Sequence, residues 1–527
     1  MGNAALIDEL RSENTALKME ISALKSEYAE MSSRLSWLME QLSLNRHKMF
    51  GASSEKSAYN QVGLFEESYQ EVEVINEPIS EKKSNKPRKK GELSSRLPKD
   101  MPVEIIECVL PDDKQECPDC GEPLHSIGSE VVRRGFKVKP ASAVITEYKR
   151  TAYSCRACDK SSDDKPVPII KAELPPQVIK GSICEPETVA HMIVQKCVMG
   201  SPLHRQEQEW NRLGIQIQRQ TMANWLIRCS EDYLEPIYDE LRRKLLLHKF
   251  LHSDGTRFQV LREPGKSPQS QSEMWIYRTS GDAKHPIVLY DYQPDKTKER
   301  PRAFLEGFYG YLMTDGCPSY HSLPEDIIVV GCFSHCRRYF FDALKTIKEE
   351  DRAGSNALIG RQYCDELFRI EREIEVDSFE ERFAVRKKKA APVLNKFYAW
   401  LLSVQPDIAP KSATGKAVNY ALRQWKYLER YLADGCIEIS NNRCERSVKP
   451  FVINRKNFLF ATSVAGGRAA AVLHSMTETA KDNGLNPFEY LSHIFRTATG
   501  INLRDNPDII TALLPENAPK ECRVGEM

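Results

Sequence analysis

Three acidic residues that lie far apart in the sequence are the strongest candidates for chemistry. Asp254 occurs in the segment HSDGT, Asp315 in MTDGC and Glu445 in NNRCERSVK. Five cations surround Glu445 in the sequence: Arg443, Arg446, Lys449, Arg455 and Lys456. Glu445 is therefore either the salt-bridge partner of a lysine one helical turn away, or a metal ligand beside a bound polyanion.

The two aspartates fall in a region whose pattern predicts strands. Residues 248–293 read as three short strands in an antiparallel meander, and residues 300–347 as helix, strand, strand and helix. This is the element order of a ribonuclease-H-like fold, in which the first and fourth strands are neighbours at the centre of the sheet. Asp254 in the first strand and Asp315 at the end of the fourth can therefore converge.

The third acid is expected on a later helix. Ser440 or Asn441 is suited to begin that helix as its N-cap, and Pro450 is expected to end it. Residues 340–434 read as entirely helical, which predicts an insertion within the catalytic domain. Glu445 would then lie at the start of a helix that follows the insertion.

Three converging carboxylates would repel one another unless cations neutralise them. Two magnesium ions about 3.5–4 Å apart meet that need. Hard oxygen ligands favour magnesium or manganese over zinc. The five basic neighbours of Glu445 would then bind DNA phosphates. Taken singly, an Asp-Gly pair is an ordinary turn former, but three acids in the order strand, strand, helix favour the metal site. His252 and His335 are expected to support the acids by hydrogen bonding.

Two cysteine pairs predict a second metal site. CPDCG and CRAC supply Cys117, Cys120, Cys155 and Cys158, which suit tetrahedral coordination of a structural zinc ion. The segment between the pairs is longer than the usual spacing, and two redox pairs or reduced structural cysteines are the alternatives.

Residues 186–230 read as three short helices with a glycine-containing turn, the pattern of a helix-turn-helix. In that hypothesis Arg219, Gln220 and Asn224 face DNA bases or phosphates. Helical pairs of this kind also occur in proteins that never bind DNA.

The N-terminal segment carries an unbroken heptad repeat. Ile7, Asn14 and Ile21 begin one apolar seam position, and Leu10 and Leu17 begin the other, through to residue 42. This spacing predicts a coiled coil that makes the protein a homodimer or a higher oligomer, and the alternative is a helix packed on its own chain. The basic stretch at 81–91 is either a solvated linker or a phosphate-binding arm.

The totals exclude some classes of protein. The chain has 527 residues and a net charge of +1, so several domains are expected and any attraction to nucleic acid must come from local clusters. No apolar run of about 18 residues or signal peptide is present, and the cysteines are mostly scattered, which predicts a cytoplasmic protein with no membrane partner.

Nearly the whole chain resembles the insertion-sequence sixty-six family of DDE-type bacterial transposases. The stretches that carry the resemblance include RHKMFGASSEK, SPLHRQEQEWNRLG, CFSHCRRYF and NNRCERSVKPFVINRKNFLFA. The resemblance implies that Asp254, Asp315 and Glu445 form the catalytic triad. It also implies DNA partners, namely the terminal inverted repeats and the target, and accessory proteins encoded by the same element. Ser440 and Cys444 depart from the family pattern without removing an acid.

The sequence thus predicts a multidomain α+β protein that cleaves and joins DNA. A structure-specific nuclease of the same fold and a non-catalytic regulator of the element are the alternatives. The expected domains are a coiled coil (1–45), a basic linker (46–100), a zinc-binding domain (101–175), a helix-turn-helix region (176–235), a ribonuclease-H-like catalytic domain (236–462) and a C-terminal helical segment (463–527).

Overall fold

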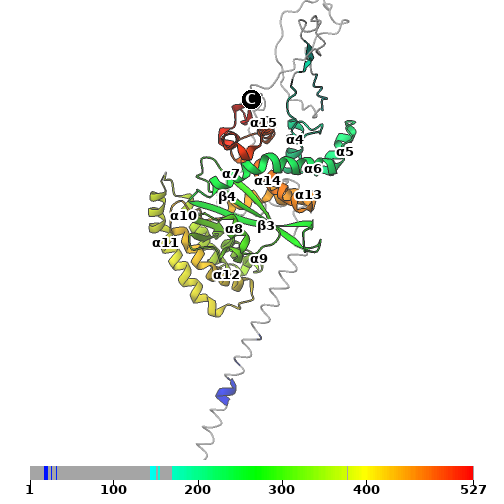
Figure 1. Ribbon diagram of the computed structural model, residues 1–527. Helices are drawn as coiled ribbons and strands as arrows, with labels where there is room; N and C mark the ends of the chain where they lie inside the picture. The colour runs from blue at the N-terminus through cyan, green and yellow to red at the C-terminus, as the bar shows by residue number, and fades with distance from the viewer. Residues whose placement is uncertain are drawn as a thin grey trace, which may run out of the picture. The chain divides into compact units, whose positions relative to one another are not determined.

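The computed structural model describes residues 17–21, 25, 31, 143–149, 152–154, 169–171, 173–376 and 378–525 (Figure 1). Residues 176–522 belong to one compact unit and residues 58–175 to another. In the latter, β1 (Ala152–Ser154) and β2 (Ile169–Lys171) pair antiparallel.

Most of the predicted coiled coil, the basic linker and all four paired cysteines lie outside the described residues. Leu17 and Ile21 of the predicted seam are helical, and about half of each side chain is exposed in the single chain.

A mixed sheet forms the centre of the larger unit. Its strands are β3 (Phe250–Arg262), β4 (Gln271–Thr279), β5 (Val288–Gln293), β6 (Gly310–Thr314) and β7 (Ile327–Gly331). They lie in the order β5-β4-β3-β6-β7. β4 pairs antiparallel with both β3 and β5, whereas β6 pairs parallel with both β3 and β7. This mixed five-stranded arrangement is consistent with the expected ribonuclease-H-like core. A short strand, β8 (Ala461–Ser463), also pairs with β3.

Two helices pack on the antiparallel part of the sheet. α13 (Asn442–Phe458) contacts β3 and β4, and α14 (Val464–Asp482) contacts β5. Phe258, Ile276 and Tyr290 of the sheet form a shared core with Phe451 of α13 and Ala471 of α14. The sheet therefore holds α13 along the strand that carries Asp254.

Hydroxyl groups of α14 satisfy the outer edge of the sheet. Ser475 Oγ accepts a hydrogen bond from the Tyr290 backbone N–H at 2.8 Å. Thr479 Oγ1 accepts one from the Val288 N–H at 3.0 Å and donates one to the Val288 carbonyl at 2.9 Å. Because an edge strand otherwise presents unpaired backbone groups, α14 both covers the core and completes the edge of β5.

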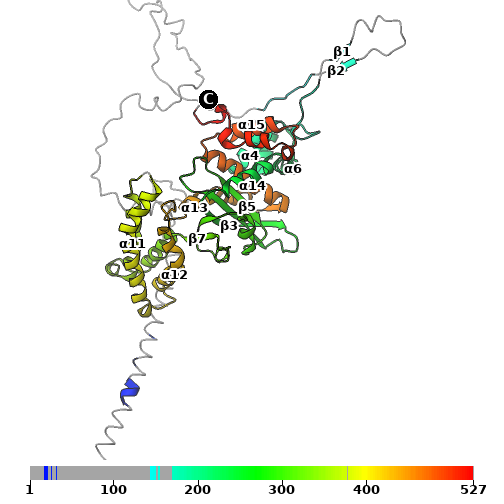
Figure 2. The ribbon, with the colours of Figure 1, turned by 60° about the vertical axis from the view of Figure 1, so that its left-hand side comes forward.

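The segment after β7 is helical, as predicted. It comprises α9 (Phe333–Lys345), α10 (Asn356–Arg372), α11 (Phe379–Val404) and α12 (Ala413–Leu428). These helices lie beside the β7 edge of the sheet, and α12 contacts β7 (Figure 2). Their core includes Phe340, Phe397 and Trp425.

Three helices precede the sheet, again where the sequence predicts them: α4 (Pro186–Cys197), α5 (Leu203–Arg212) and α6 (Arg219–Cys229). A π-helical turn (Ser230–Leu234) then leads into α7 (Glu235–Leu245). α4 packs against α15 (Pro487–Ala498), so the predicted helix-turn-helix region shares a core with the C-terminal helices.

The prediction that Pro450 ends its helix is wrong, because α13 continues through it to Phe458. A proline inside a helix removes one hydrogen bond and costs about 3 kcal/mol. Cys444, Phe451 and Asn454 are buried on either side of Pro450, and their packing offsets that loss.

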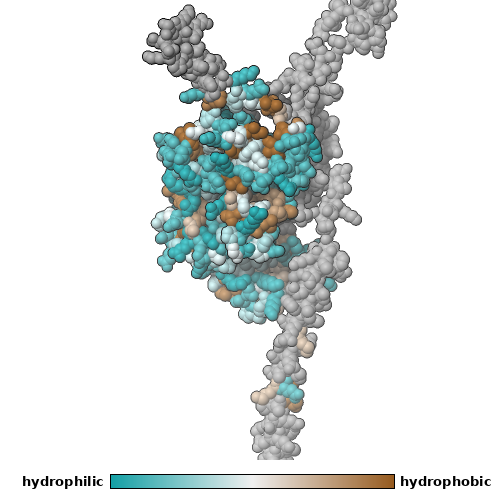
Figure 3. All heavy atoms as spheres, turned by 45° about the vertical axis from the view of Figure 1, so that its right-hand side comes forward, coloured by the Kyte–Doolittle hydropathy of each residue, from teal (hydrophilic) through white to brown (hydrophobic). Residues whose placement is uncertain are grey.

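Among the helices in the described part of the chain, none is long and apolar enough to cross a bilayer. On the face drawn in Figure 3, hydrophilic residues predominate and hydrophobic residues form small groups between them.

A buried ion pair holds the insertion together, and its loss should be measurable. Arg386 is fully buried, and it donates to both Glu371 carboxylate oxygens at 2.7 Å and to the carbonyls of Tyr431 and Asp434. Arg386→Ala should lower the free energy of unfolding by about 3–5 kcal/mol, because Glu371 would remain as an uncompensated, largely buried charge. Urea unfolding followed by tryptophan fluorescence measures this.

Arg369→Ala is the matched control, since Arg369 forms exposed ion pairs with Glu366 and Glu373 in α10 and just after it. Exposed pairs contribute about 1 kcal/mol at most. Equal losses for the two variants would contradict the structural role of Arg386.

Candidate active site

The register between β3 and β6 brings the two aspartates together. His252 of β3 is the partner of Met313 in the parallel pairing. The same register, continued by two residues on each strand, sets Asp254 opposite Asp315. Neighbouring strands lie about 4.8 Å apart, so the two carboxylates emerge side by side on the same face.

Backbone amides orient both aspartates. The Gly255 N–H donates to Asp254 Oδ1 at 2.7 Å, and the Cys317 N–H donates to Asp315 Oδ1 at 2.9 Å. Each carboxylate therefore keeps its second oxygen available for another partner.

Glu445 enters the site from the first turn of α13. Its Oε1 lies 3.6 Å from His335 Nδ1, and its Oε2 lies 3.3 Å from an Arg338 guanidinium nitrogen. His335 and Arg338 are three residues apart in α9 and so share one face of that helix. α9 thus supplies two cationic partners for the acid on α13.

Asn441 links the elements that carry the acids. Its side chain is fully buried, with Nδ2 donating to the Ser253 carbonyl at 2.9 Å and Oδ1 lying 3.0 Å from His252 Nδ1. Its backbone carbonyl accepts the Glu445 N–H at 3.0 Å. Asn441 stands at the N-cap position of α13, but its side chain does not cap the helix because it is bonded to β3. The amide therefore joins the start of α13 to the strand residue next to Asp254.

The pKa values of Asp254 and His335 are shifted by burial and by the charged groups beside them. Burial, followed by the charges of Asp315 and Glu445, raises the pKa of Asp254 to about 7. Burial lowers the pKa of His335, but Cys332 and Glu445 outweigh that effect and raise it to about 9. The site therefore contains Asp254, whose carboxyl group loses its proton less readily than usual, and His335, whose positive charge stabilises Glu445.

The donor set fits a divalent cation. Carboxylate oxygens are the ligands that magnesium and manganese prefer. Glu445 Oε1 is buried without a hydrogen-bond partner among the described residues, and a positive ion beside Asp254 would offset the like charges that raise its pKa.

The five basic residues around Glu445 differ in their surroundings. Arg446 and Lys456 are exposed, and Lys449 is partly exposed. Arg455 donates to Thr256 Oγ1 at 3.3 Å, two residues beyond Asp254.

Arg443 is engaged within the protein. Its Nε donates to Glu438 Oε1 at 2.8 Å, and the same oxygen accepts the Gly281 N–H at 2.9 Å. His252 Nε2 lies 3.6 Å from that oxygen as well. Arg443 and His252 therefore share one carboxylate that supports the start of α13.

The predicted recognition residues lie on an exposed face of α6. Arg219, Gln220 and Asn224 are all exposed, and Gln220 Nε2 donates to Asn224 Oδ1 at 3.2 Å. Glu207 of α5 accepts the Arg219 backbone N–H at 2.9 Å, which fixes the start of α6. These side chains are separate from the carboxylates.

The sequence analysis missed several residues beside the acids. Arg338 was within reach of a sequence argument, because it follows His335 by three positions on one helix. Glu273 and Lys296 could not be predicted from the sequence, because their 3.3 Å ion pair joins β4 to a loop after β5. Glu273 also packs against the glycine that follows Asp254, where an added Cβ would lie 2.8 Å from Glu273 Oε1.

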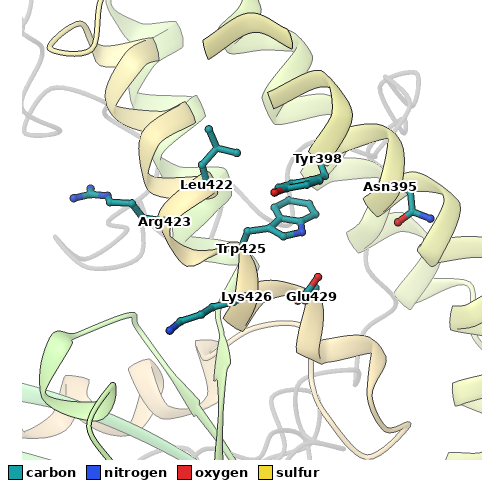
Figure 4. Close-up of a pocket in the computed structure, with 7 residues that line it drawn as sticks. All are labelled: Asn395, Tyr398, Leu422, Arg423, Trp425, Lys426 and Glu429. Atoms are coloured by element: carbon teal, nitrogen blue, oxygen red, sulfur yellow. The ribbon is translucent and has the colours of Figure 1, made fainter. Parts of the chain in front are cut away.

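A shallow pocket elsewhere in the unit contains none of the three carboxylates. It lies between α11 and α12, where Tyr398 stacks on Trp425 with ring centroids 4.8 Å apart (Figure 4). The residues that line it are Asn395, Tyr398, Leu422, Arg423, Trp425, Lys426 and Glu429.

Comparison with known proteins identifies the family. A family model described as "Transposase IS66 family" matches residues 181–469, which is more than half of the chain. The protein belongs to the IS66 family of DDE-type transposases. Two further models match this IS66 transposase, the zinc-finger binding domain of transposase IS66 at residues 114–159 and "Transposase C of IS166 homeodomain" at residues 37–106.

Relatives of this IS66 transposase cover most of its length. The uncharacterized protein y4jD of Sinorhizobium fredii is 30% identical over 82% of this chain and 83% of its own. The uncharacterized protein y4qI of the same organism is 29% identical over 95% of this chain and 92% of its own. A solved Drosophila P element transposase strand transfer complex is 12% identical with a TM-score of 0.35, over 57% of this chain and 94% of that one.

The bonds made by Asn441 predict a loss of activity larger than its effect on stability. Asn441→Ala would remove the hydrogen bonds to the Ser253 carbonyl and to His252 Nδ1, which should cost about 1–3 kcal/mol in folding and loosen Glu445 relative to Asp254. We expect DNA cleavage by the folded protein to fall about 10-fold or more, since small misplacements of catalytic groups cost up to about 100-fold. Cleavage rate, DNA affinity and thermal stability should be measured together.

Asn454→Ala is the control from the same helix. Asn454 is similarly buried, but its amide donates to the Cys197 carbonyl at 2.6 Å in α4, away from the acids. If both variants lose stability and cleavage in the same proportion, Asn441 has only a structural role.

Proposed function

We propose that this IS66-family transposase uses Asp254, Asp315 and Glu445 to bind divalent cations, magnesium or manganese, and with them cleaves and rejoins DNA. The proposal is supported by the positions of the three acids on β3, at the end of β6 and in the first turn of α13, and by the register of β3 with β6. The raised pKa of Asp254 supports it, because that shift arises in part from the other two carboxylates.

The proposed reaction has two phosphodiester transfers. Water first attacks a phosphodiester at each end of the element and frees a 3′-hydroxyl. That hydroxyl then attacks a target phosphodiester in line, which joins the element to the target and releases a second 3′-hydroxyl. When bound, the cations would supply Lewis-acid stabilisation of the developing negative charge.

The chain's own residues would hold the acids in place during both steps. Backbone amides orient Asp254 and Asp315, and Asn441 fixes the start of α13. Arg338 and His335 hold Glu445 from α9. No protein nucleophile takes part, so no covalent protein–DNA intermediate forms.

DNA binding is proposed to use two sets of side chains. Arg446, Lys449, Arg455 and Lys456 follow Glu445 along α13 and would contact phosphates near the cleaved bond. Arg219, Gln220 and Asn224 on the exposed face of α6 would read the terminal inverted repeats. Arg443, whose guanidinium is bonded to Glu438, would act mainly by supporting α13.

The remaining modules are proposed to assemble the complex. Cys117, Cys120, Cys155 and Cys158 would bind one structural zinc ion, a proposal supported by the zinc-finger family match at residues 114–159. The heptad segment would pair two chains so that each active site acts on one DNA end, and accessory proteins of the same element would act with them.

Replacing Glu445 tests the proposed site. Glu445→Gln should lower magnesium-dependent cleavage of terminal-repeat DNA by about 100-fold or more, because it removes one preorganised charge from the reacting centre. Glu429→Gln, an exposed acid after α12, is the control and should cleave normally. Undiminished cleavage by Glu445→Gln would falsify the assignment.

The products of the same assay separate a transposase reaction from that of a nuclease. Joined molecules that contain both repeat and target DNA are the expected product. Cut ends without joined product, with target DNA in excess, would instead favour a structure-specific nuclease.

The heptad seam predicts a change in mass when it is disrupted. Leu17→Glu combined with Leu24→Glu places charges in the seam, so the protein should sediment with half the mass of the unaltered dimer. Met19→Glu combined with Ser26→Glu adds the same charge on the outer face of the helix and should leave the mass unchanged. Equal masses for both double variants would show that the seam does not hold chains together.

A further inference from the structure

A cluster of three different metal-binding side chains lies on the α9 side of Glu445. Cys332 immediately precedes α9, His335 lies in its first turn, and Glu445 lies in the first turn of α13. One ligand atom from each residue lies within 4.8 Å of the other two. Neither Cys332 nor His335 belongs to the three-carboxylate site.

Two of these ligand atoms are buried without the hydrogen bonds that such atoms normally have. His335 Nδ1 and Glu445 Oε1 form an ion pair at 3.6 Å, which is too long for a hydrogen bond, and neither atom has a hydrogen-bond partner among the described residues. A buried polar atom without a partner is costly and calls for an explanation such as a missing ion. The imidazole nitrogen and the carboxylate oxygen face each other, as they would across a shared ligand.

The third ligand, Cys332, already accepts a hydrogen bond at its sulfur. Cys332 is 1% exposed, and its Sγ accepts the Asn441 backbone N–H at 3.1 Å. This bond fixes the position of the sulfur, the atom through which cysteine binds metals. Asn441 thus contacts the thiol on one side and the start of α13 on the other.

The donor types select a metal class different from that of the carboxylate site. A thiolate, an imidazole and one carboxylate oxygen suit zinc, whereas magnesium avoids sulfur. Ligand atoms around tetrahedral zinc lie about 3.3–3.8 Å apart. The His335–Glu445 distance of 3.6 Å already fits, and the three atoms, which lie within 4.8 Å of one another, would draw closer on binding. Three protein ligands leave a fourth position for water or a DNA phosphate oxygen.

We infer that Cys332, His335 and Glu445 form a zinc site that competes with the magnesium site for Glu445. Zinc bound there would hold Glu445 on the α9 side and reduce its contribution to the carboxylate cluster. The consequence for activity rests on the proposed function, whereas the binding of zinc does not.

Among the residues that the structure describes, Arg338 is a cation close enough to this cluster to oppose a bound metal ion. Its guanidinium lies 3.3 Å from Glu445 Oε2, on the oxygen that the zinc site does not use. The Arg338 side chain is 43% exposed, so it can turn toward solvent when an ion enters. The departure of Arg338 therefore requires no rearrangement of the core.

Counting bound zinc tests the site directly. Full-length protein, dialysed against buffered zinc, should bind one more zinc ion per chain than the Cys332→Ser variant. Cys336→Ser is the control, because Cys336 lies one turn further along α9 and contacts Cys364 at 3.9 Å rather than the cluster. The control should bind as many ions as the unaltered protein.

Cobalt provides an independent readout of the ligands. Cobalt-loaded protein should lose part of its thiolate-to-metal absorption in Cys332→Ser and retain it in Cys336→Ser. If Cys332→Ser does not fold, judged by circular dichroism, His335→Asn takes its place in the zinc count and should also bind one ion fewer.

A zinc titration of magnesium-dependent DNA cleavage tests the competition. With each rate normalised to that variant's own zinc-free rate, half-inhibition of Cys332→Ser should need at least about 10-fold more zinc than half-inhibition of the unaltered protein or Cys336→Ser. More magnesium should relieve the inhibition of the unaltered protein.

The possible failures are distinguishable. Equal zinc counts in the unaltered protein and Cys332→Ser overturn the site, even if cleavage is normal. An extra zinc ion without any difference in inhibition overturns the competition and leaves the site standing. Absence of cleavage in every form, with the extra zinc ion present, overturns the proposed function and not the zinc site.

Discussion

The parallel register of β3 and β6 is the constraint on which the active site depends. A shift of one residue would turn one aspartate to the opposite face of the sheet. Buried side chains on both faces prevent this shift, because Leu251 and Leu312 pack on one side while Phe250 and Met313 pack on the other. The apolar core of the sheet thereby determines where two carboxylates meet, although neither carboxylate belongs to that core.

The third carboxylate depends on a different kind of contact. Glu445 reaches the sheet on a helix, and a helix lying on a sheet can slide along it unless polar contacts fix its position. Asn441 supplies such contacts, since its buried amide can satisfy the Ser253 carbonyl in only one position of α13. Hydrophobic burial holds α13 against the sheet, and the amide of Asn441 fixes its position along the sheet.

The sequence was sufficient to predict what depends on local pattern. Strand periodicity and the two Asp-Gly segments placed Asp254 and Asp315 on neighbouring strands, and the helical insertion also appeared where it was expected. The family and its DDE type were confirmed by the family match. The zinc cysteines lie outside the described residues, and the metal-binding roles of the acids remain predictions.

Contacts between distant segments could not be predicted in the same way. Asn441 reads as a helix cap, because the partners that redirect its side chain lie 188 and 189 residues away. Pro450 reads as a helix end, because the sheet that stabilises the helix beyond it is invisible to a local rule. Arg443 reads as a free cation, although Glu438 and the loop at Gly281 hold it within the protein.

The cations of α9 explain how three acids can share one region without driving α13 from the sheet. Two like charges 4 Å apart repel by about 1–4 kcal/mol between bulk-water and protein-surface dielectric values. Arg338 and His335 face the two oxygens of Glu445 and offset this repulsion, whereas burial and the charges of Asp315 and Glu445 raise the pKa of Asp254. In the proposed function, a divalent cation at the aspartates would have to compete with α9 for Glu445. Zinc on Cys332 and His335 would strengthen the α9 side, so the carboxylate proposed to complete the magnesium site would also limit it.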